Sequence, residues 1–521
     1  MLPLRFVFIL LILVLVTPCP AQQPAGTPSP KGLGTINFPN SCAPEAQPAL
    51  LEGIAQLHSF QYAAAEKAFE GVSQADPRCA MAYWGLAMSN YRQLWDGADE
   101  KALVKGRESL EKIQKDWPVS KREREYIDAI GIIFASSRTL KNESINGYSR
   151  ALAEICKHYP DDGEAQAFYA LSLLALPSRG DDTETRKEVI AILNRLSARQ
   201  PQHPGAVHYL IHAADTPELA PLGLEAARRY AKIAPASSHA LHMPSHIFVR
   251  LGLWQESIDS NQAAAVAAAD ATQQHMGEAH YQFHAMDFLN YSYLQMGQEA
   301  KARQIIEDLN KVPGRTAEVT TNVRVNFTTR TLLELHRWQE ALVLAPEGDG
   351  PDQQMIYMLR TIAAARTGDA KAAEWNLNSL KKAFKQERRR DRRLEDYRRQ
   401  VAEAWVEYAK GKYDKALKKI RAVADTQDRD DPGPFGVTAR EMLADMLLES
   451  HQPGPALAAY ESVLKLAPNR FNALYGAAAA ADMAGDAGKA KSYYSKLRDN
   501  CPAQADREEL QKARLASAGS D

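Results

Sequence analysis

The sequence predicts an all-α protein, a solenoid built from antiparallel helical hairpins. Between Glu45 and the C-terminus, no segment alternates polar and apolar residues at period two, as a half-buried strand would. Small, large and proline residues recur at fixed offsets, as in Ala456, Tyr460 and Pro468, and Pro468 lies 34 residues before Pro502. The small residue lets two helices approach, and the large one fills the groove between them. The proline ends the unit because it cannot continue a helix.

The same triplet occurs near both ends of the array. Its other clear copies are Ala65, Phe69, Pro77 and Ala490, Tyr494, Pro502. These residues resemble the tetratricopeptide repeat family, in which a unit of about 34 residues forms one helical hairpin. The resemblance extends over residues 47–502, with few signature residues between 116 and 200. It implies a right-handed superhelix of about twelve hairpins, in which the first helix of each hairpin lines a concave groove.

The N-terminus has the features of a secretory signal peptide. Arg5 precedes the apolar run Phe6–Val16, and Ala21 offers a small residue for cleavage. The run is too short for a stable membrane anchor, and no later segment is apolar for long enough to span a bilayer. Two phrases, LHSFQYAAAEKAF with DPRCAMAYWGLAMS and HALHMPSHIFVRLG, also resemble a family of exported bacterial repeat proteins of unestablished activity. We therefore expect an exported protein, periplasmic or secreted, whose mature chain begins near Gln22.

Composition and repeat quality divide the chain. We expect a signal peptide at 1–21, a flexible leader rich in Pro, Gly and Gln at 22–44, tetratricopeptide-like hairpins at 45–203, histidine-rich hairpins at 204–345, C-terminal hairpins at 346–510 and a tail at 511–521. With 24% charged residues and a formal net charge of −1, the chain offers no electrostatic case for a nucleic-acid partner. The family resemblance implies a protein or peptide partner instead.

Four of the five cysteines follow the signal peptide. Cys42 precedes the first helix and Cys79 opens the second hairpin, so the two can meet and tie the leader to the array. Export would place them in an oxidising compartment, where disulfides persist. We predict a Cys42–Cys79 disulfide. Cys156 and Cys501 lie too far apart in an extended array to pair, and we expect them to be buried thiols.

Histidines are concentrated in one part of the chain. Nine of the thirteen lie between residues 203 and 284, and six of these form three H-x-x-x-H pairs. The pairs are His208 and His212, His242 and His246, and His280 and His284. A spacing of four puts both rings of a pair on one helix face. The second pair follows the first by 34 residues and the third follows the second by 38, so we expect all three on equivalent faces of neighbouring helices.

The repeat register adds further residues to the same groove. The groove-facing positions are His239, Asp287, Tyr291, Asn326 and Arg330. Asp215 lies three residues after His212, as Asp287 does after His284, and each could bind an ion or orient a ligand's second nitrogen. Pro244 lies within a presumed helix, and a kink there would turn His239 and His242 relative to His246.

Clustered imidazoles predict a transition-metal site. Protonated rings held close together repel one another, and neutral rings buried without partners are costly. A metal ion removes both problems, because neutral imidazole is a common metal ligand. We predict that the six paired histidines converge on one site, with Asp287 beside them and His239 at the edge. The ligand set suits zinc, copper, iron or nickel without choosing among them, and six rings allow two ions or one ion with further histidines around it.

Three functions remain open on the sequence. The first is an exported scaffold with a metal site in its groove, and the second is a metal-free scaffold for a protein or peptide. The third is a metalloenzyme, which we favour less, because no catalytic residue can be named. The residue after the first histidine of each pair is Tyr209, Met243 or Tyr281, so the glutamate base of the zinc proteases is absent. The sequence also has no Gly-rich phosphate loop and no recognisable nucleophile elbow.

Overall fold

The computed structural model describes residues 27–28, 32–94, 97–136, 138–177, 182–274, 279–348, 350–386, 392–431, 433 and 435–518. The predicted signal peptide and its cleavage site lie outside these residues. Within them, no helix combines the length and the apolar character needed to cross a membrane.

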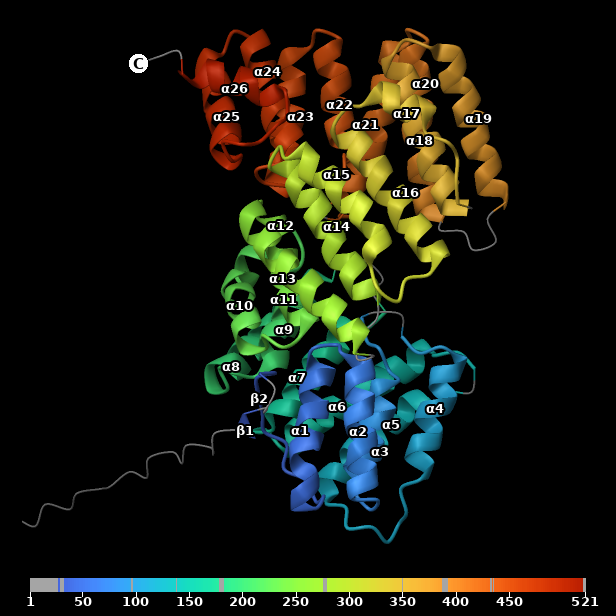
Figure 1. The fold of residues 1–521 in the computed structure, drawn as a ribbon, viewed down its shortest axis with the longest axis vertical. Helices are drawn as coiled ribbons and strands as arrows, with labels where there is room; N and C mark the ends of the chain where they lie inside the picture. Colours follow the sequence, from blue (N-terminus) through green and yellow to red (C-terminus); the bar gives the residue numbers. More distant parts are fainter. Residues whose placement is uncertain are drawn as a thin grey trace, which may run out of the picture.

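Helices that pair with their sequence neighbours build the described chain (Figure 1). The N-terminal arm, residues 32–203, contains η1 (Pro44–Ala46), α1 (Gln47–His58), α2 (Tyr62–Ala75), α3 (Ala80–Ser89), α4 (Glu100–Glu111), α5 (Lys121–Phe134), α6 (Asn142–His158), α7 (Gly163–Leu174) and α8 (Thr183–Arg199). The central hairpins, residues 204–345, contain α9 (Pro204–Ala214), α10 (Ala220–Ile233), α11 (Ser238–His242), α12 (Pro244–Arg250), α13 (Trp254–Gln273), α14 (Ala279–Gln295), α15 (Glu299–Asp308), η2 (Leu309–Lys311), α16 (Ala317–Glu334) and α17 (Trp338–Val343). The C-terminal arm, residues 346–518, contains α18 (Gly350–Arg366), α19 (Ala370–Gln386), α20 (Arg392–Ala409), α21 (Tyr413–Arg429), α22 (Ala439–Glu449), α23 (Pro453–Leu466), α24 (Phe471–Met483), α25 (Ala487–Asn500) and α26 (Glu509–Ala518). The predicted all-α class is confirmed.

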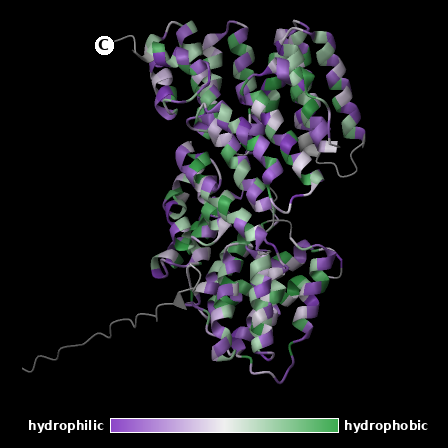
Figure 2. Cartoon of the chain, viewed as in Figure 1, coloured by the Kyte–Doolittle hydropathy of each residue, from purple (hydrophilic) through white to green (hydrophobic). Residues whose placement is uncertain are grey.

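Phe69 shows how the small–large pattern produces packed hairpins. Its side chain on α2 is fully buried between Gly53 of α1 and Gly85 of α3, where an added Cβ would overlap the ring. Tyr460 of α23 packs in the same way against Gly476 of α24. Figure 2 shows hydrophilic and hydrophobic residues interspersed along the helices of all three parts, as amphipathic hairpins require.

The leader is packed against the N-terminal arm, so the prediction of a flexible leader is wrong for residues 32–44. Leu33 and Phe38 are buried in the core of that arm. Ahead of the helical array, β1 (Thr27–Pro28) pairs antiparallel with β2 (Thr35–Ile36). The burial of Leu33, Ile36 and Phe38 stabilises the docked leader by more than the conformational entropy that its Pro- and Gly-rich backbone loses.

Covalent and backbone contacts fasten the leader further. The backbone N–H of Thr35 donates to the carbonyl of Gln202 at 2.9 Å. The structure contains the Cys42–Cys79 disulfide, with a Cα–Cα distance of 4.7 Å. Cys156 and Cys501 are free and only partly buried, and desolvation raises the pKa of each thiol to about 12.

Pro244 interrupts the helix as anticipated. α11 ends at His242 and α12 begins at Pro244, whose missing N–H is harmless at a first helical position. The chain keeps a helical path across the break, because Met243 N donates to His239 O at 2.9 Å and His246 N donates to Met243 O at 3.2 Å. Ser245 Oγ also donates to His242 O at 2.7 Å. The interruption therefore does not separate the faces on which the histidines lie.

The C-terminal arm folds back onto the central hairpins, and α24 packs against α14 (Figure 1). Arg470, at the start of α24, is buried. It forms ion pairs with Glu334 of α16 and Glu441 of α22. It also donates from Nη1 to the hydroxyl of Tyr291 at 2.6 Å. A buried guanidinium needs partners of this kind, so the network fixes how the arm sits.

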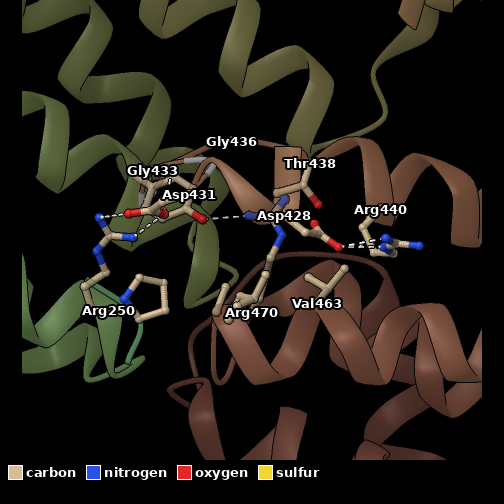
Figure 3. Close-up of a pocket in the computed structure, with 13 residues that line it drawn as sticks. Arg250, Asp428, Asp431, Gly433, Gly436, Thr438, Arg440, Val463 and Arg470 are labelled. Carbon is tan, nitrogen blue, oxygen red and sulfur yellow. Dashed lines mark hydrogen bonds and ion pairs between the residues drawn. The ribbon is translucent and has the colours of Figure 1, made fainter. Parts of the chain in front are cut away.

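A second joint lies at the turn between α12 and α13. Arg250 makes two 2.9 Å hydrogen bonds to the carboxylate of Asp431, and Figure 3 shows the two side chains facing each other beside the Asp428–Arg440 pair. Gly252, with φ +66°, comes so close to the carbonyl of Pro468 that a side chain there would overlap it. The array is therefore closed on itself, which an extended solenoid would not be.

The hydrophobic interior is divided, and the end of the chain belongs to it. One large core extends from Leu33 to Phe248, another extends from Ile362 to Ala513, and smaller clusters lie between them. The predicted tail at 511–521 is wrong at its start, because α26 continues to Ala518 and Ala513 is buried. The histidine-bearing helices α9, α11, α12 and α14 lie where the first core gives way to the smaller clusters.

Candidate metal centre

Six histidines form two neighbouring triads on α9, α11, α12 and α14. Triad A consists of His208 and His212 on α9 and His239 on α11, and triad B consists of His242 on α11, His246 on α12 and His284 on α14. In each triad, one nitrogen from every ring lies within 4.8 Å of the other two. Each triad thus combines one i, i+4 pair with a third ring from the next helix in the array.

Triad B brings together two nitrogens that both carry lone pairs. His242 Nδ1 lies 2.6 Å from Asn261 Oδ1, an acceptor because the Asn261 amide N–H₂ donates to Ser257 O. His246 Nδ1 lies 2.8 Å from a carboxylate oxygen of Asp215. Both rings therefore carry a proton on Nδ1. Their Nε2 atoms, which hold the lone pairs of the neutral rings, are only 3.1 Å apart.

Triad A repeats this geometry with one difference. His208 Nδ1 donates to the backbone carbonyl of His58 at 2.6 Å, so the neutral ring has its lone pair on Nε2. That atom lies 3.1 Å from His212 Nε2. A neutral His212 protonated on Nε2 would satisfy the contact. Triad A is therefore compatible with an empty site, whereas triad B places two acceptors against each other.

Asp215 holds a groove histidine in place. One of its carboxylate oxygens accepts from His246 Nδ1 at 2.8 Å, and the other accepts from Arg250 Nε at 2.9 Å. Burial opposes ionisation, but the His246 hydrogen bond and the charge of Arg250 lower the pKa of Asp215 well below its usual value. A carboxylate that accepts from the second nitrogen of a ligand is the usual support of a metal-bound histidine.

An aromatic ring backs each triad. Phe60, fully buried, has its ring centroid 4.5 Å from that of His208, 5.5 Å from that of His212 and 5.6 Å from that of His239. Phe288, also buried, lies 4.7 Å from His242, 4.8 Å from His246 and 5.3 Å from His284. These rings keep water from the rear of the triads and lower the local dielectric.

Burial lowers the pKa of five triad histidines, namely His208, His212, His239, His242 and His284. Burial first, and the neighbouring His212 next, hold the pKa of His208 well below its usual value. Burial and the nearby His246 lower the pKa of His212 to about 3 and that of His284 to about 4. Burial also lowers the pKa values of His239 and His242, with help from His208 and His284 respectively. Neutral rings are the form that binds a metal ion.

A groove of about 770 Å³ opens onto both triads. Four of the six triad histidines line it, namely His212, His239, His246 and His284. Leu94 of the N-terminal arm and Met355 and Arg398 of the C-terminal arm line its other walls. His208 and His242 do not line it and lie beneath the other rings. All three parts of the molecule therefore contribute to one groove.

The remaining predicted site residues divide into two groups. His280 and Asp287 line the groove, but neither belongs to a triad. Asp287 is instead paired with Arg330 at 2.5 Å. Asn326 is exposed in the groove and Arg330 lines an adjoining cavity of about 750 Å³.

The predicted placements of Tyr291, His239 and His280 need correction. Tyr291 does not line the histidine groove, because it is buried and its hydroxyl accepts a hydrogen bond from Arg470 at the inter-arm joint. His239 is a full member of triad A, while His280, predicted inside the cluster, lies at its edge. The predicted single site is in fact two adjacent sets of three rings.

A third buried group escaped sequence reasoning. Glu164 accepts from His58 Nε2 at 2.6 Å and lies 3.2 Å from His203 Nε2, and all three side chains are fully buried. His58 Nδ1 accepts from the Tyr209 hydroxyl at 2.9 Å, so His58 donates from Nε2 to Glu164, while His203 Nδ1 accepts from the Ala206 N–H at 3.1 Å. Neither His58 nor Glu164 belongs to a spaced pair that the sequence could reveal.

Comparison with known proteins yields structural likeness only. No family model matches the chain, and no curated protein matches its sequence. The Cut9–Hcn1 hetero-tetramer of the APC/C covers 77% of this chain and 80% of its own at 11% identity and a TM-score of 0.38. The human IFIT1 dimer with PPP-AAAA covers 86% and 88% at 12% identity and a TM-score of 0.34. The TPR domain of P58(IPK) covers 76% and 98% at 14% identity and a TM-score of 0.21.

These likenesses are distant and concern the fold alone. The fold is established by the chain's own helix pairs, in which Phe69 and Tyr460 pack against small residues of neighbouring helices. The protein is an all-α array of helical hairpins.

Proposed function

We propose that this protein is an exported scaffold that binds a transition-metal ion in its histidine groove. The observation that carries the proposal is the 3.1 Å separation of His242 Nε2 and His246 Nε2, two atoms whose lone pairs face each other. Two acceptors at this distance repel unless a positive charge lies between them. The charge is either a proton or a metal ion.

The distance suits a metal ion. Imidazole nitrogens bind zinc at about 2.0–2.1 Å, so two of them 3.1 Å apart would subtend an angle of about 95–102° at the ion. That angle lies between those of octahedral and tetrahedral coordination. His284 contributes a third nitrogen to the same set. A proton is shared by two atoms and needs no third, so the convergence of three rings favours the metal.

The type of ligand narrows the choice of metal ion. Both triads consist of imidazoles alone, and imidazole suits zinc, copper, iron and nickel, whereas calcium and magnesium prefer oxygen. Asp215 would act as the support of His246 and not as a ligand, because both of its oxygens are engaged. Export, the other part of the proposal, is supported by the N-terminal apolar run and by the Cys42–Cys79 disulfide, a bond typical of oxidising compartments.

The test is metal uptake by purified protein at neutral pH. We expect the wild-type chain, stripped with a chelator and dialysed against zinc, to retain metal, and the double variant His212→Ala/His246→Ala to lose most of it. His158→Ala is the matched control, because that histidine lies on the surface of α6, paired with Glu125. Circular dichroism should show the same helical signal in all three. A wild-type chain that retains no zinc, copper, nickel or iron would contradict the proposal and leave the groove as a polar binding surface.

A further inference from the structure

We infer that the two triads hold two ions side by side as one dinuclear centre, whose open coordination positions face the groove and bind a small exogenous anion. The inference rests on the proposed metal binding and extends it to the number of ions and the class of ligand. It is argued from three features of the triads: their reach, their mutual distance and their orientation.

The reach of a single ion is too short for both triads. Two nitrogens on one ion can be no further apart than twice the bond length, about 4.2 Å. Among the described residues, no group of ligand atoms that all lie within 4.8 Å of one another contains more than three histidines. No such group includes members of both triads. Each triad also has its own anchored ring, because His208 is fixed by His58 O and His242 by Asn261 Oδ1. One ion cannot replace two without a rearrangement of buried rings.

The two triads are nevertheless immediate neighbours. Ring centroids are 6.3 Å apart between His212 and His246, and 6.1 Å apart between His239 and His242. These separations across the triads match the 6.4 Å between His212 and His239 within triad A. The two ions would therefore occupy one chamber, as in the two-metal sites that clamp a ligand between them.

The open positions point to the groove. Three protein ligands leave a zinc-like ion at least one position for water or another ligand. The rear of each triad is closed by Phe60 or Phe288, whereas His212, His239, His246 and His284 border the groove. The free side of both ions is therefore the groove side.

The nearest candidate carboxylates are already in use. Asp215 is held by His246 and Arg250, and Asp287 is paired with Arg330. Neither is free to bridge two ions without losing those contacts. Two dipositive ions on neutral imidazoles carry four positive charges, which only an anion from solution can offset at the open positions. The ligand is thus a small anion or a molecule with an anionic donor group.

The first test is the number of ions per chain. We expect zinc- or cobalt-loaded wild type to contain two ions per chain by mass spectrometry of the metal. His239→Gln and His284→Gln, one in each triad, should each contain one. His280→Gln is the matched control, because His280 lines the same groove and belongs to neither triad, and it should keep two. Circular dichroism of each variant identifies loss of metal through unfolding. Copper(II) signals in wild type should also show mutual broadening that the single-triad variants lack, which tests the inference even if a variant is unstable.

The second test is the anion. Azide added to the cobalt- or copper-loaded wild type and to His280→Gln should change the absorption spectrum with a saturable dose response. One ion per chain in wild type would overturn the dinuclear centre and leave the proposed metal binding intact, while no bound ion would overturn both. If the chain holds two ions but azide leaves the absorption spectrum unchanged, the inference that the ions have open coordination positions is wrong.

Discussion

At the scale of the residue, Asp215 is the best point at which to separate support of the metal from binding of the metal. It touches a triad only through His246 Nδ1 and is itself held by Arg250. Loss of a carboxylate in this position usually costs a metal site about 10–100-fold in affinity.

We therefore predict that Asp215→Asn weakens zinc binding by about 10–100-fold while the helical signal stays unchanged. The amide still accepts one hydrogen bond but no longer enhances the basicity of His246. Competition with a chromophoric chelator measures the affinity. Asp287→Asn is the control, since Asp287 lies in the same groove but pairs with Arg330, and its affinity should stay close to wild type. Equal losses in the two variants would contradict the support role of Asp215.

The paired histidines could be predicted from the sequence, but the third ring of each triad and the aromatic ring behind it could not. A spacing of four fixes which rings share a helix face, so His208 with His212 and His242 with His246 followed from the sequence alone. The third ring of each triad depends on how neighbouring helices are rotated. A repeat register estimates that rotation only to about one turn, so His239 was placed at the edge and His280 in the centre. Phe60 and Phe288 look like any other core aromatic until the packing is known.

At the scale of the element, the buried Glu164 links four segments of the N-terminal arm. It accepts from His58 of α1 and from the backbone N–H of Asn37 in the leader at 3.4 Å, and it lies 3.2 Å from His203 Nε2, just before α9. Burial opposes its charge, but His203 and His58 lower the pKa of Glu164 far below its usual value. The carboxylate is therefore ionised in the folded state.

We predict that Glu164→Ala destabilises the N-terminal arm by about 3–5 kcal/mol, the usual cost of leaving one side of a buried polar pair without its partner. Urea unfolding followed by tryptophan fluorescence measures the change, because Trp84 lies in this core. Glu154→Ala, on the exposed face of α6, should leave the midpoint where it is. A midpoint that Glu164→Ala does not move would show that the two histidines find other acceptors.

The leader explains why elements of low repeat content were harder to predict. Its composition, rich in Pro and Gly, is typical of flexible segments. Yet Leu33, Ile36 and Phe38 supply enough apolar surface to dock it, and Glu164 offers an acceptor for its backbone. The sequence contains a signal for this docking, because apolar residues lie close together before the first helix. An argument from average composition does not detect such a short group.

At the scale of the whole molecule, the Arg470 network makes closure of the array sensitive to pH. Two buried carboxylates, Glu334 and Glu441, share one guanidinium. Burial raises the pKa of Glu441 to about 7, from 4.5. Between pH 4.5 and about 7, Glu441 is protonated in the folded chain and ionised in the unfolded chain. The contribution of Glu441 to stability is therefore largest in acid and is lost as the pH rises from about 4.5 through 7.

We predict that Glu441→Gln, which fixes the neutral form, becomes progressively more stable relative to wild type as the pH is raised across this window. Thermal midpoints of both proteins measured at several pH values give the difference, from which the effects of all other titrating groups largely cancel. Glu508→Gln, an exposed carboxylate on the same arm, should show no such trend. A difference that shrinks with rising pH would mean that Glu441 is ionised in the folded protein.

Closure also changes the order in which the chain can fold. Hairpins form between neighbours in sequence, so most of this molecule needs only local contacts and can assemble hairpin by hairpin. The joints are different: Arg250 meets Asp431 across 181 residues, and Arg470 meets Tyr291 across 179. Until the C-terminal arm has docked, the groove lacks the wall that Met355 and Arg398 provide in the closed array. We expect one slow, long-range docking step after a series of fast local ones, and the interval between them is a period in which metal ions can reach the histidines from the open side.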